Sequence, residues 1–459
     1  MNIKKTPAKA SKTKATASKA ESTDSDFSLP NSQFSPPQTG LVPKLRFPEF
    51  QGAGDWETVE LGEKVDLISG YPFDGPDISE DNRGIRLLRG INITEGIIRH
   101  SLEIDRFYTR STEGLEKFRL KRDDLVIGMD GSKVGKNSAL VSDDDVDALL
   151  IQRVARLRAT SPSLIQFIFQ RINSPYFHKY VDRVNTSSGI PHISLKQIRE
   201  FRLCFPADAE QQKIASCLSS LDELIAAQAR KLEALRTHKK ALMQQLFPRD
   251  GETTPRLRFP EFQDAGEWEE VPLGDIAEIK LGKMLDKKKH TSGHLLPYLN
   301  NLAVRWNEVN ITGLPQMYFG DHELDRFGLR ASDVVVCEGG EPGRAAVWDG
   351  RLPHVKFQKA LHRVRFVVPY EPKLLVLHLE NLAGTKQFEM LFTGGGIKHL
   401  TRETFAQFKV PLTTFPEQQR IAACLTSLDD LITAQTQKLA ALRTQKQALM
   451  QQLFPSLEE

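Results

Sequence analysis

The chain contains one unusual phrase twice. "PKLRFPEF" occupies residues 43 to 50 and "PRLRFPEF" occupies residues 255 to 262, and a tryptophan follows each phrase at the same distance, Trp56 and then Trp268. A run of eight such residues does not recur at a constant offset by chance, so internal duplication constrains the fold more than any local motif does. We therefore expect the chain to fold as two similar halves.

A second repeat closes each half. "EQQKIASCLSSLDELIAAQARKLEALRTHKKALMQQLFP" (210 to 248) returns as "EQQRIAACLTSLDDLITAQTQKLAALRTQKQALMQQLFP" (417 to 455), identical at about three of every four positions. Between these markers the two halves share only fragments. This is the pattern of a duplicated framework that carries two different inserts, and we expect the inserts to differ in what they recognise.

The closing repeat predicts a long amphipathic helix. Apolar residues recur at alternating spacings of four and three, as in a coiled coil. The seam positions are Ile214, Leu218, Leu221, Ile225, Gln228, Leu232, Leu235, Lys239, Leu242 and Leu246, and then Ile421, Leu425, Leu428, Ile432, Gln435, Leu439, Leu442, Lys446, Leu449 and Leu453. Capping boxes are predicted at Asp208 to Gln211 and at Thr414 to Glu417, with Pro248 and Pro455 ending the helices. Each helix should have about 38 residues and a length of about 57 Å.

A single amphipathic helix of this length is marginal in water, so it needs a partner along its stripe. One alternative is that each helix packs on its own insert. The sustained spacing favours a facing helix instead, and the other copy is the obvious one. We expect the two helices to pair antiparallel, with Gln228 and Gln435 helping to set the register.

The inserts are predicted to be compact α/β domains. "DDLVIGM" (123 to 129) and "DVVVCEG" (333 to 339) have the pattern of buried strands that enter turns, whereas "SLIQFIFQRINSPYF" (163 to 177) and "KLLVLHLENLAGTKQF" (373 to 388) have helical spacing. The expected fold is α+β, with two pseudo-symmetric globular domains joined by an antiparallel coiled coil. The predicted segments are a disordered basic tail (1–42), domain 1 (43–208), helix 1 (209–248), a linker (249–254), domain 2 (255–415) and helix 2 (416–455).

Composition narrows the class of protein. The sequence has no apolar run long enough for a membrane span and no secretory signal, so we expect a cytoplasmic protein. The four cysteines are widely spaced, which favours free thiols over a metal site. The first 40 residues carry six lysines and three acidic residues, and this excess equals the formal net charge of +3. Overall charge therefore gives no argument for nucleic-acid binding.

Three near-matches to catalytic motifs fail on inspection. "DGSKVGKN" (130 to 137) is one residue short of a phosphate-binding loop, and Asn137 stands where a Ser or Thr is needed. "FTGGG" (392 to 396) has no counterpart in the first insert, and "NSPY" (173 to 176) lacks the second proline of an adenine-methyltransferase motif. We therefore predict no catalytic and no metal site.

Polar loops with cations and small residues occur at corresponding places in both inserts. "GSKVGK" (131 to 136) and "GGEPGR" (339 to 344) are glycine turns, and "TSSGIPHISLKQI" (186 to 198) and "TGGGIKHLTRETF" (393 to 405) are loops that lead towards a helix or an extended segment. Taken singly, each loop favours an ordinary turn over a phosphate contact, and the case for phosphate contacts comes from both inserts having such loops at corresponding places. The candidate DNA-contacting residues are Lys133, Lys136, Ser187, Ser188, His192, Lys196, Lys287, Lys288, Arg344, Lys398 and His399.

The combination of motifs resembles a known family. The doubled phrase, "GIRLLRGINIT" (84 to 94), "DLVIGMDGSKVGK", "SSGIPHISLKQI", "VVVCEGGEPGR", "GGGIKHLTRETF" and the two closing helices closely resemble the specificity subunit of type I restriction-modification enzymes. The resemblance spans about residues 43 to 455. Only the long basic tail departs from it.

The resemblance implies that each insert is a target recognition domain for one half of a bipartite sequence in double-stranded DNA. It also implies two methyltransferase subunits, which bind S-adenosylmethionine and methylate adenine N6, and two restriction subunits that use ATP and Mg²⁺. The chain itself would hold no cofactor and would not be an enzyme. A methylation-only complex without restriction subunits would need the same specificity subunit and stays an alternative. A self-contained methyltransferase and a pure interaction scaffold are the rival classes.

Overall fold

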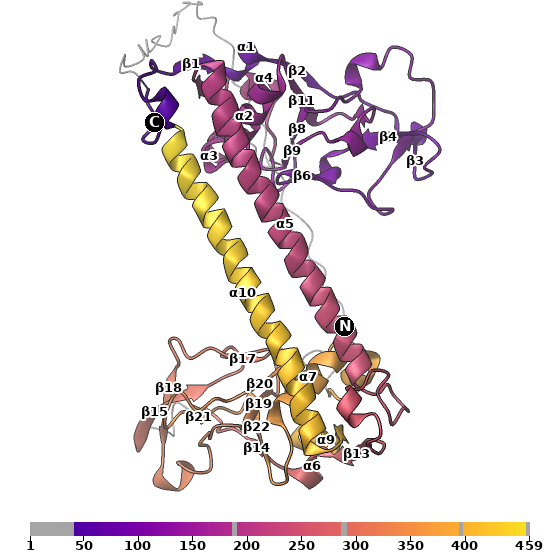
Figure 1. The fold of residues 1–459 in the computed structure, drawn as a ribbon, viewed down its shortest axis with the longest axis vertical. Coiled ribbons are helices and arrows are strands. Elements are labelled where there is room, and N and C mark those ends of the chain that lie inside the picture. The colour runs from indigo at the N-terminus through magenta and orange to yellow at the C-terminus, as the bar shows by residue number, and fades with distance from the viewer. Residues whose placement is uncertain (1–40, 186–190, 286–291, 394–397, 456–459) are drawn as a thin grey trace, which may run out of the picture.

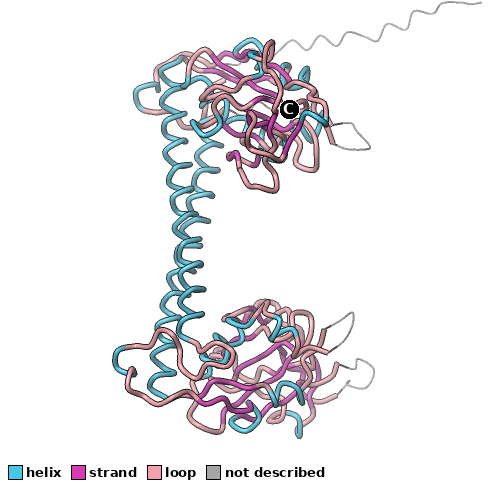
Figure 2. The backbone as a smooth tube through the Cα atoms, turned by 90° about the vertical axis from the view of Figure 1, so that its right-hand side faces the viewer, coloured by secondary structure: helices cyan, strands magenta, loops and turns pink. Residues whose placement is uncertain are grey.

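The computed structural model describes residues 41–185, 191–285, 292–393 and 398–455. Two globular domains lie at opposite ends of a pair of long helices, α5 (Asp208–Leu246) and α10 (Phe415–Leu453), which run antiparallel side by side (Figure 1). Each helix has 39 residues and is therefore about 58 Å long. In Figure 2 both domains project to the same side of the helix pair, whereas in Figure 1 they extend to opposite sides of it. The predicted fold class is confirmed, whereas residues 1–40 of the predicted tail lie outside the described residues.

Domain 1 is built on an antiparallel sheet with the strand order β2-β11-β8-β9 and a second sheet with the order β10-β4-β7-β3. Its strands are β1 (Glu57–Glu60), β2 (Val65–Ser69), β3 (Ile78–Ser79), β4 (Ile85–Leu88), β5 (Ile93–Thr94), β6 (Ile97–Ile98), β7 (Phe107–Tyr108), β8 (Leu125–Gly128), β9 (Ser138–Leu140), β10 (Leu149–Leu150), β11 (Val154–Ala159) and β12 (Arg202–Phe205). Its helices are α1 (Leu61–Lys64), α2 (Pro162–Ile172), α3 (Pro175–Val184) and α4 (Leu195–Arg199).

Domain 2 repeats this plan with the sheets β14-β22-β19-β20 and β18-β15-β21. Its strands are β13 (Glu269–Pro272), β14 (Ala277–Leu281), β15 (His294–Leu299), β16 (Val304–Arg305), β17 (Glu308–Val309), β18 (Gln316–Phe319), β19 (Val334–Cys337), β20 (Ala345–Val347), β21 (Lys356–Phe357), β22 (Leu361–Phe366) and β23 (Lys409–Leu412). Its helices are α6 (Leu273–Ile276), α7 (Pro372–Leu382), α8 (Lys386–Glu389) and α9 (Arg402–Gln407). The strands predicted at 123–129 and 333–339 are β8 and β19, both fully buried between neighbouring strands.

Each domain core contains residues from both long helices. In domain 1, Ile214 from the start of α5 and Leu453 and Phe454 from the end of α10 pack in one buried cluster with Trp56. In domain 2 the roles are exchanged, because α10 contributes its start and α5 contributes Leu246 and Phe247. The two halves therefore close into a ring.

The repeated phrase attaches each domain to the long helices. Arg46 donates from Nε and Nη2 to the carboxylate of Glu210, both at 2.7 Å, and Arg258 donates in the same way to Glu417 at 2.7 and 2.8 Å. These ion pairs are almost wholly buried. The backbone N–H of Leu45 also donates to the carbonyl of Gln452 at 2.9 Å, so the phrase joins its domain to both helices.

The predicted capping boxes are wrong. The N-cap residues of α5 and α10 are Ala207 and Thr414, and neither side chain caps its helix. Glu417 is instead held by Arg258, and the amide of Gln211 donates to the carbonyl of Pro206 at 2.8 Å. Glu417 is thus engaged by a distant residue and Gln211 by the loop just before its helix, so neither side chain forms the predicted cap. The helices end at Leu246 and Leu453, two residues before the predicted proline stops.

The predicted seam is confirmed. All twenty seam residues are buried or half-buried, whereas most other positions along both helices are exposed. Gln228 donates from Nε2 to Oε1 of Gln435 at 2.6 Å, near the middle of the pair. Such a buried amide pair favours one register at some cost in stability.

Two charged contacts flank the glutamine pair. Lys239 of α5 lies 2.6 Å from Asp429 of α10, and Lys446 of α10 lies 2.6 Å from Asp222 of α5. Each lysine thus joins the two helices next to one domain. The ammonium of Lys239 also lies 2.9 Å from Glu380 of α7, so this contact reaches into domain 2.

Candidate nucleic-acid interface

In domain 1 the structure brings two of the predicted loops together. The loop after β8 pairs with the chain that precedes α4: Asp130 and His192 form an isolated β-bridge, and the N–H of Gly131 donates to the carbonyl of Pro191 at 3.1 Å. The N–H of Ile193 donates to the carbonyl of Met129 at 2.9 Å. "GSKVGK" and the end of "TSSGIPHIS" therefore belong to one surface.

Domain 2 has the equivalent arrangement. Gly339 and His399 form a β-bridge, and the N–H of Leu400 donates to the carbonyl of Glu338 at 2.8 Å. A glycine ends the turn in both domains because a side chain does not fit there. A Cβ at Gly135 would lie 2.7 Å from Val181, and one at Gly343 would lie 2.3 Å from the ring of Phe388. Both glycines also have positive φ, +67° and +87°.

The lysines of domain 1 lie at the surface. Lys133 is 62% exposed and 3.1 Å from Glu95, Lys136 is 3.4 Å from Asp182, and Lys196 is 80% exposed on α4. Exposed ion pairs of this kind contribute little to stability, so the ammonium groups can exchange these partners for a phosphate. His192 is also exposed.

The candidates of domain 2 divide into two kinds. Lys398 is 54% exposed and forms an ion pair with Glu389, and His399 is 45% exposed with Nδ1 3.0 Å from Glu338. Arg344, in contrast, is only 14% exposed. Its guanidinium donates to the carbonyl of Asn301 at 2.7 Å and to Glu341 at 2.6 Å. Arg344 thus holds two loops together, whereas Lys398 is presented to solvent.

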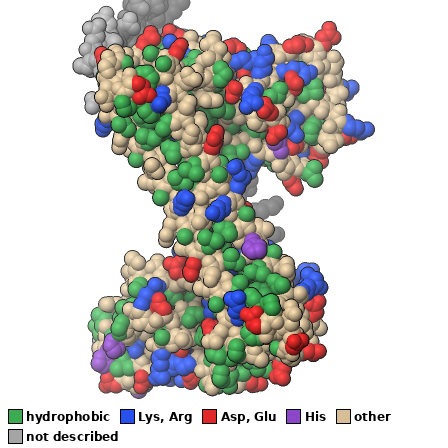
Figure 3. Space-filling view, in the orientation of Figure 1, with side chains coloured by type: hydrophobic (Ala, Val, Ile, Leu, Met, Phe, Trp, Pro, Cys, Tyr) green, Lys and Arg blue, Asp and Glu red, His purple; other side chains and the backbone are tan. Residues whose placement is uncertain are grey.

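Four candidates, Ser187, Ser188, Lys287 and Lys288, lie outside the described residues. Charge on the visible face is mixed, because Figure 3 shows Lys and Arg interspersed with Asp and Glu over both domains. This distribution agrees with the balanced charge of the sequence beyond the tail. On this face the charged side chains form local groups rather than a broad basic field (Figure 3).

Sequence reasoning missed a hollow beside the loop of domain 1. It has a volume of about 560 Å³ and is lined by Lys133 together with Arg89 from the end of β4 and Gln152 and Arg153 from the turn before β11. Arg153 has a positive φ of +66° and donates to Asp130 at 3.0 Å. The charged "RLLRG" and "IQR" stretches contain these residues, but only the fold places them together.

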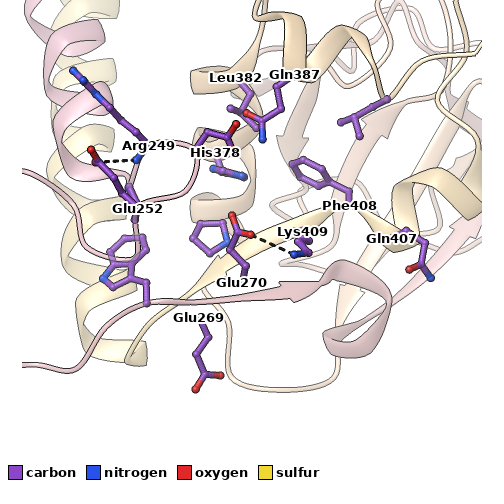
Figure 4. Close-up of a pocket in the computed structure, with 15 residues that line it drawn as sticks. Arg249, Glu252, Glu269, Glu270, His378, Leu382, Gln387, Gln407, Phe408 and Lys409 are labelled. Atoms are coloured by element: carbon purple, nitrogen blue, oxygen red, sulfur yellow. Dashed lines mark hydrogen bonds and ion pairs between the residues drawn. The ribbon is translucent and has the colours of Figure 1, made fainter.

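A second hollow, of about 340 Å³, lies in domain 2 where the 249–254 linker passes β13 and the end of α7 (Figure 4). Burial lowers the pKa of His378 in this hollow to about 4, so its imidazole is neutral near pH 7. In domain 1, the guanidinium carbon of Arg171 lies 3.9 Å from the ring centroid of Tyr176 and 5.0 Å from that of Phe454, at the joint with the end of α10. This hollow belongs to the joint between domain and helices and not to the candidate interface.

Within the described residues, no group of three or more His, Cys, Asp or Glu side chains is placed to hold a metal ion. Over the same residues, no helix has both the length and the apolar character of a membrane span. Two domains that present equivalent but different polar loops on a two-helix spacer define a class of recognition protein.

Comparison with known proteins identifies the family. The family described as "Type I restriction modification DNA specificity domain" matches this chain twice, over residues 54–237 and 265–444. The chain therefore belongs to the type I restriction-modification DNA specificity family, and it is a specificity subunit. This agrees with the resemblance drawn from the sequence.

The individual proteins that this chain is similar to are also specificity subunits of type I systems. The chain is 21% identical over 421 residues to the type I restriction enzyme MjaVIII specificity subunit of Methanocaldococcus jannaschii, covering 89% of this chain and 93% of that protein. It is 30% identical over 173 residues to the EcoAI specificity subunit of Escherichia coli, covering 37% of this chain and 28% of that protein. The crystal structure of an S subunit from M. genitalium shares the fold, with a TM-score of 0.59, 16% identity and coverage of 91% of this chain and all of that one.

Proposed function

We propose that this specificity subunit reads a bipartite sequence in double-stranded DNA, with one half read by each domain. The observation that carries this proposal is the repetition of one loop arrangement on two domains that differ in their exposed side chains. An antiparallel coiled coil of fixed register separates the two domains, so the distance between the half-sites should also be fixed. In the view of Figure 2 both domains project to the same side of the helices, which suits two contacts with one duplex.

We further propose that the chain acts without chemistry of its own, in the cytoplasm, as a scaffold for partner subunits. Two methyltransferase subunits would bring S-adenosylmethionine and transfer its methyl group to adenine N6. Two restriction subunits, where they exist, would use ATP and Mg²⁺. One solved structure that is similar to this chain, with a TM-score of 0.50 and 17% identity, concerns the complex assembly and conformational transition of a type I restriction-modification system. The methylation-only complex stays the alternative, and isolating the complex with its natural partners decides between the two.

Within the interface, the exposed lysines are proposed as phosphate contacts. Lys133, Lys136 and Lys196 serve domain 1, and Lys398 serves domain 2. His192 and His399 flank these lysines and are proposed as further polar contacts. Arg344 is proposed to position the 339–344 loop, because two of its nitrogens are already engaged.

The test is to express the chain with its methyltransferase subunit and to map modified adenines across a genome. We expect two short defined sequences separated by an unspecified spacer of constant length. A single uninterrupted target would contradict the two-domain proposal. Methyl transfer by the purified chain alone would contradict its non-catalytic role.

A further inference from the structure

An aliphatic side chain stands at the same exposed position in both domains. Ile91 is the third residue after β4 and is 48% exposed, and Leu302 is the third residue after the equivalent strand, β15, and is 75% exposed. Leu45 and Leu257 are also exposed at equivalent positions, but they belong to the repeated phrase and not to the inserts. Two inserts that diverge almost everywhere have thus both kept an exposed aliphatic residue here.

Hydrogen bonds of an asparagine side chain hold the backbone of each turn. In domain 1 the wholly buried Asn92 receives the N–H of Arg89 on Oδ1 at 3.2 Å and donates from Nδ2 to Asp105 at 3.0 Å. In domain 2 the side-chain oxygen of Asn300 accepts the N–H groups of Leu302 and Ala303, both at 3.1 Å. These hydrogen bonds fix the backbone of both turns, and the side chains of Ile91 and Leu302 stay exposed on them.

Ile91 and Leu302 both lie beside the candidate loops. Ile91 lines the same hollow as Lys133, Gln152 and Arg153. In domain 2, the residue before Leu302 contacts the equivalent loop, because Asn301 donates from Nδ2 to the carbonyl of Gly339 at 3.3 Å. The aliphatic group is thus part of the proposed interface in each domain.

The surroundings indicate which partner this group fits. The other side chains of the hollow are mostly polar or charged, with Ile151 as the exception, so the hollow does not resemble the contiguous apolar patch of a protein-docking site. Arg and Gln are the side chains that pair with guanine and adenine edges in the major groove. The thymine C5-methyl is the apolar group on those edges, and aliphatic side chains contact it.

We propose that Ile91 and Leu302 each contact a thymine methyl group in the major groove of their own half-site. This inference rests on the proposed function, since it assumes that each domain reads DNA. It assigns to each half-site at least one A·T pair that is recognised through an apolar contact.

The test uses the complete methyltransferase complex and duplexes in which each thymine of the target is replaced, one at a time, by deoxyuridine, which lacks the methyl group. In each half-site one replacement should weaken binding by about three- to fivefold, as expected for losing one buried methyl group. Ile91→Ala should abolish this effect in one half-site only, and Leu302→Ala in the other only. The controls are Val146→Ala and Val367→Ala, which remove methyl groups from exposed valines outside the candidate loops.

Several results would overturn the inference. The absence of any deoxyuridine effect in a half-site would do so, as would a deoxyuridine effect of equal size in the wild type and both variants. Loss of complex assembly in Ile91→Ala or Leu302→Ala, with unchanged DNA affinity of whatever complex remains, would mark a protein-docking surface instead. Failure of the wild-type complex to bind any bipartite duplex would contradict the proposed function itself, which is a separate outcome.

Discussion

The two lysines of the coiled-coil seam are equivalent in sequence, but the structure predicts unequal roles. Lys239 is 8% exposed and contacts two carboxylates, Glu380 and Asp429, which are themselves only 25% and 22% exposed. Lys446 contacts Asp222 alone, which is 38% exposed. Replacing Lys239 by methionine therefore removes the cation between two half-buried acids, whereas replacing Lys446 removes it from one acid that water can reach and that still accepts a hydrogen bond from Gln170.

The size of each effect follows from this burial. Removing one partner of a fully buried ion pair costs about 3–5 kcal/mol. Because water reaches part of both acids and Lys373 remains 3.4 Å from Asp429, we expect about 2 kcal/mol for Lys239→Met. An exposed pair contributes at most about 1 kcal/mol, and we expect that value for Lys446→Met.

The sign of the pH dependence is also defined. Burial lowers the pKa of Lys239, but its hydrogen bonds with Asp429 and Glu380 outweigh that effect and raise the pKa above its ordinary value. A group with a raised folded-state pKa stabilises the fold below its ordinary pKa, and this contribution is lost as the pH rises through the folded-state pKa. Alkaline pH should therefore loosen the wild-type joint at domain 2 and leave Lys239→Met less affected.

Hydrogen exchange measures each joint separately. Exchange of the last two turns of α5 should become about thirtyfold faster in Lys239→Met, and exchange of the last two turns of α10 about fivefold faster in Lys446→Met. Lys240→Met, at an exposed neighbouring position, should change neither joint. Equal losses at the two joints, or no loss in Lys239→Met, would refute this reasoning.

Three further predictions concern closure, spacing and phosphate contacts. Phe454→Ala should lower the free energy of unfolding of domain 1 by about 3–5 kcal/mol in a denaturation experiment, because this ring is buried against Phe167. Phe415→Ala should lower it far less, because that ring is half-exposed. Equal costs would contradict the closed ring. Adding seven residues after Leu232 and seven after Ile432 should lengthen both helices by about 10.5 Å. On a panel of methylation substrates, the preferred spacer should then increase by about three base pairs. An unchanged preference in a folded variant would mean that helix length does not set the distance. Lys133→Ala and Lys398→Ala should each reduce the salt slope of DNA binding by about one unit without changing the preferred sequence, and a selective loss at one base pair would instead indicate direct readout.

Sequence alone predicted the seam because heptad spacing reports directly on which residues face another helix. It predicted the equivalent loops because duplication aligned two divergent inserts. The capping box predicted at Thr414 to Glu417 failed for a physical reason, since Glu417 is bound by Arg258, which lies 159 residues away. A local pattern contains no information about partners at that distance.

The candidate interface shows the same division. Lys133 and Lys136 became candidates because they lie within a glycine turn. Arg89 and Arg153 were missed because two distant segments bring them into one hollow, and no short motif contains both. Arg344 shows the opposite case, since an arginine on a glycine turn suggested a phosphate contact, yet the fold uses its guanidinium to hold the turn to Asn301.

The central claim is that each domain reads its own half-site independently of the other. The most direct measurement exchanges residues 270–408 for the equivalent segment of another specificity subunit and then maps the methylated sequence with the same methyltransferase partner. The claim predicts that one half-site changes, while the other half-site and the length of the spacer stay the same. A change in both half-sites, or in neither, would contradict it.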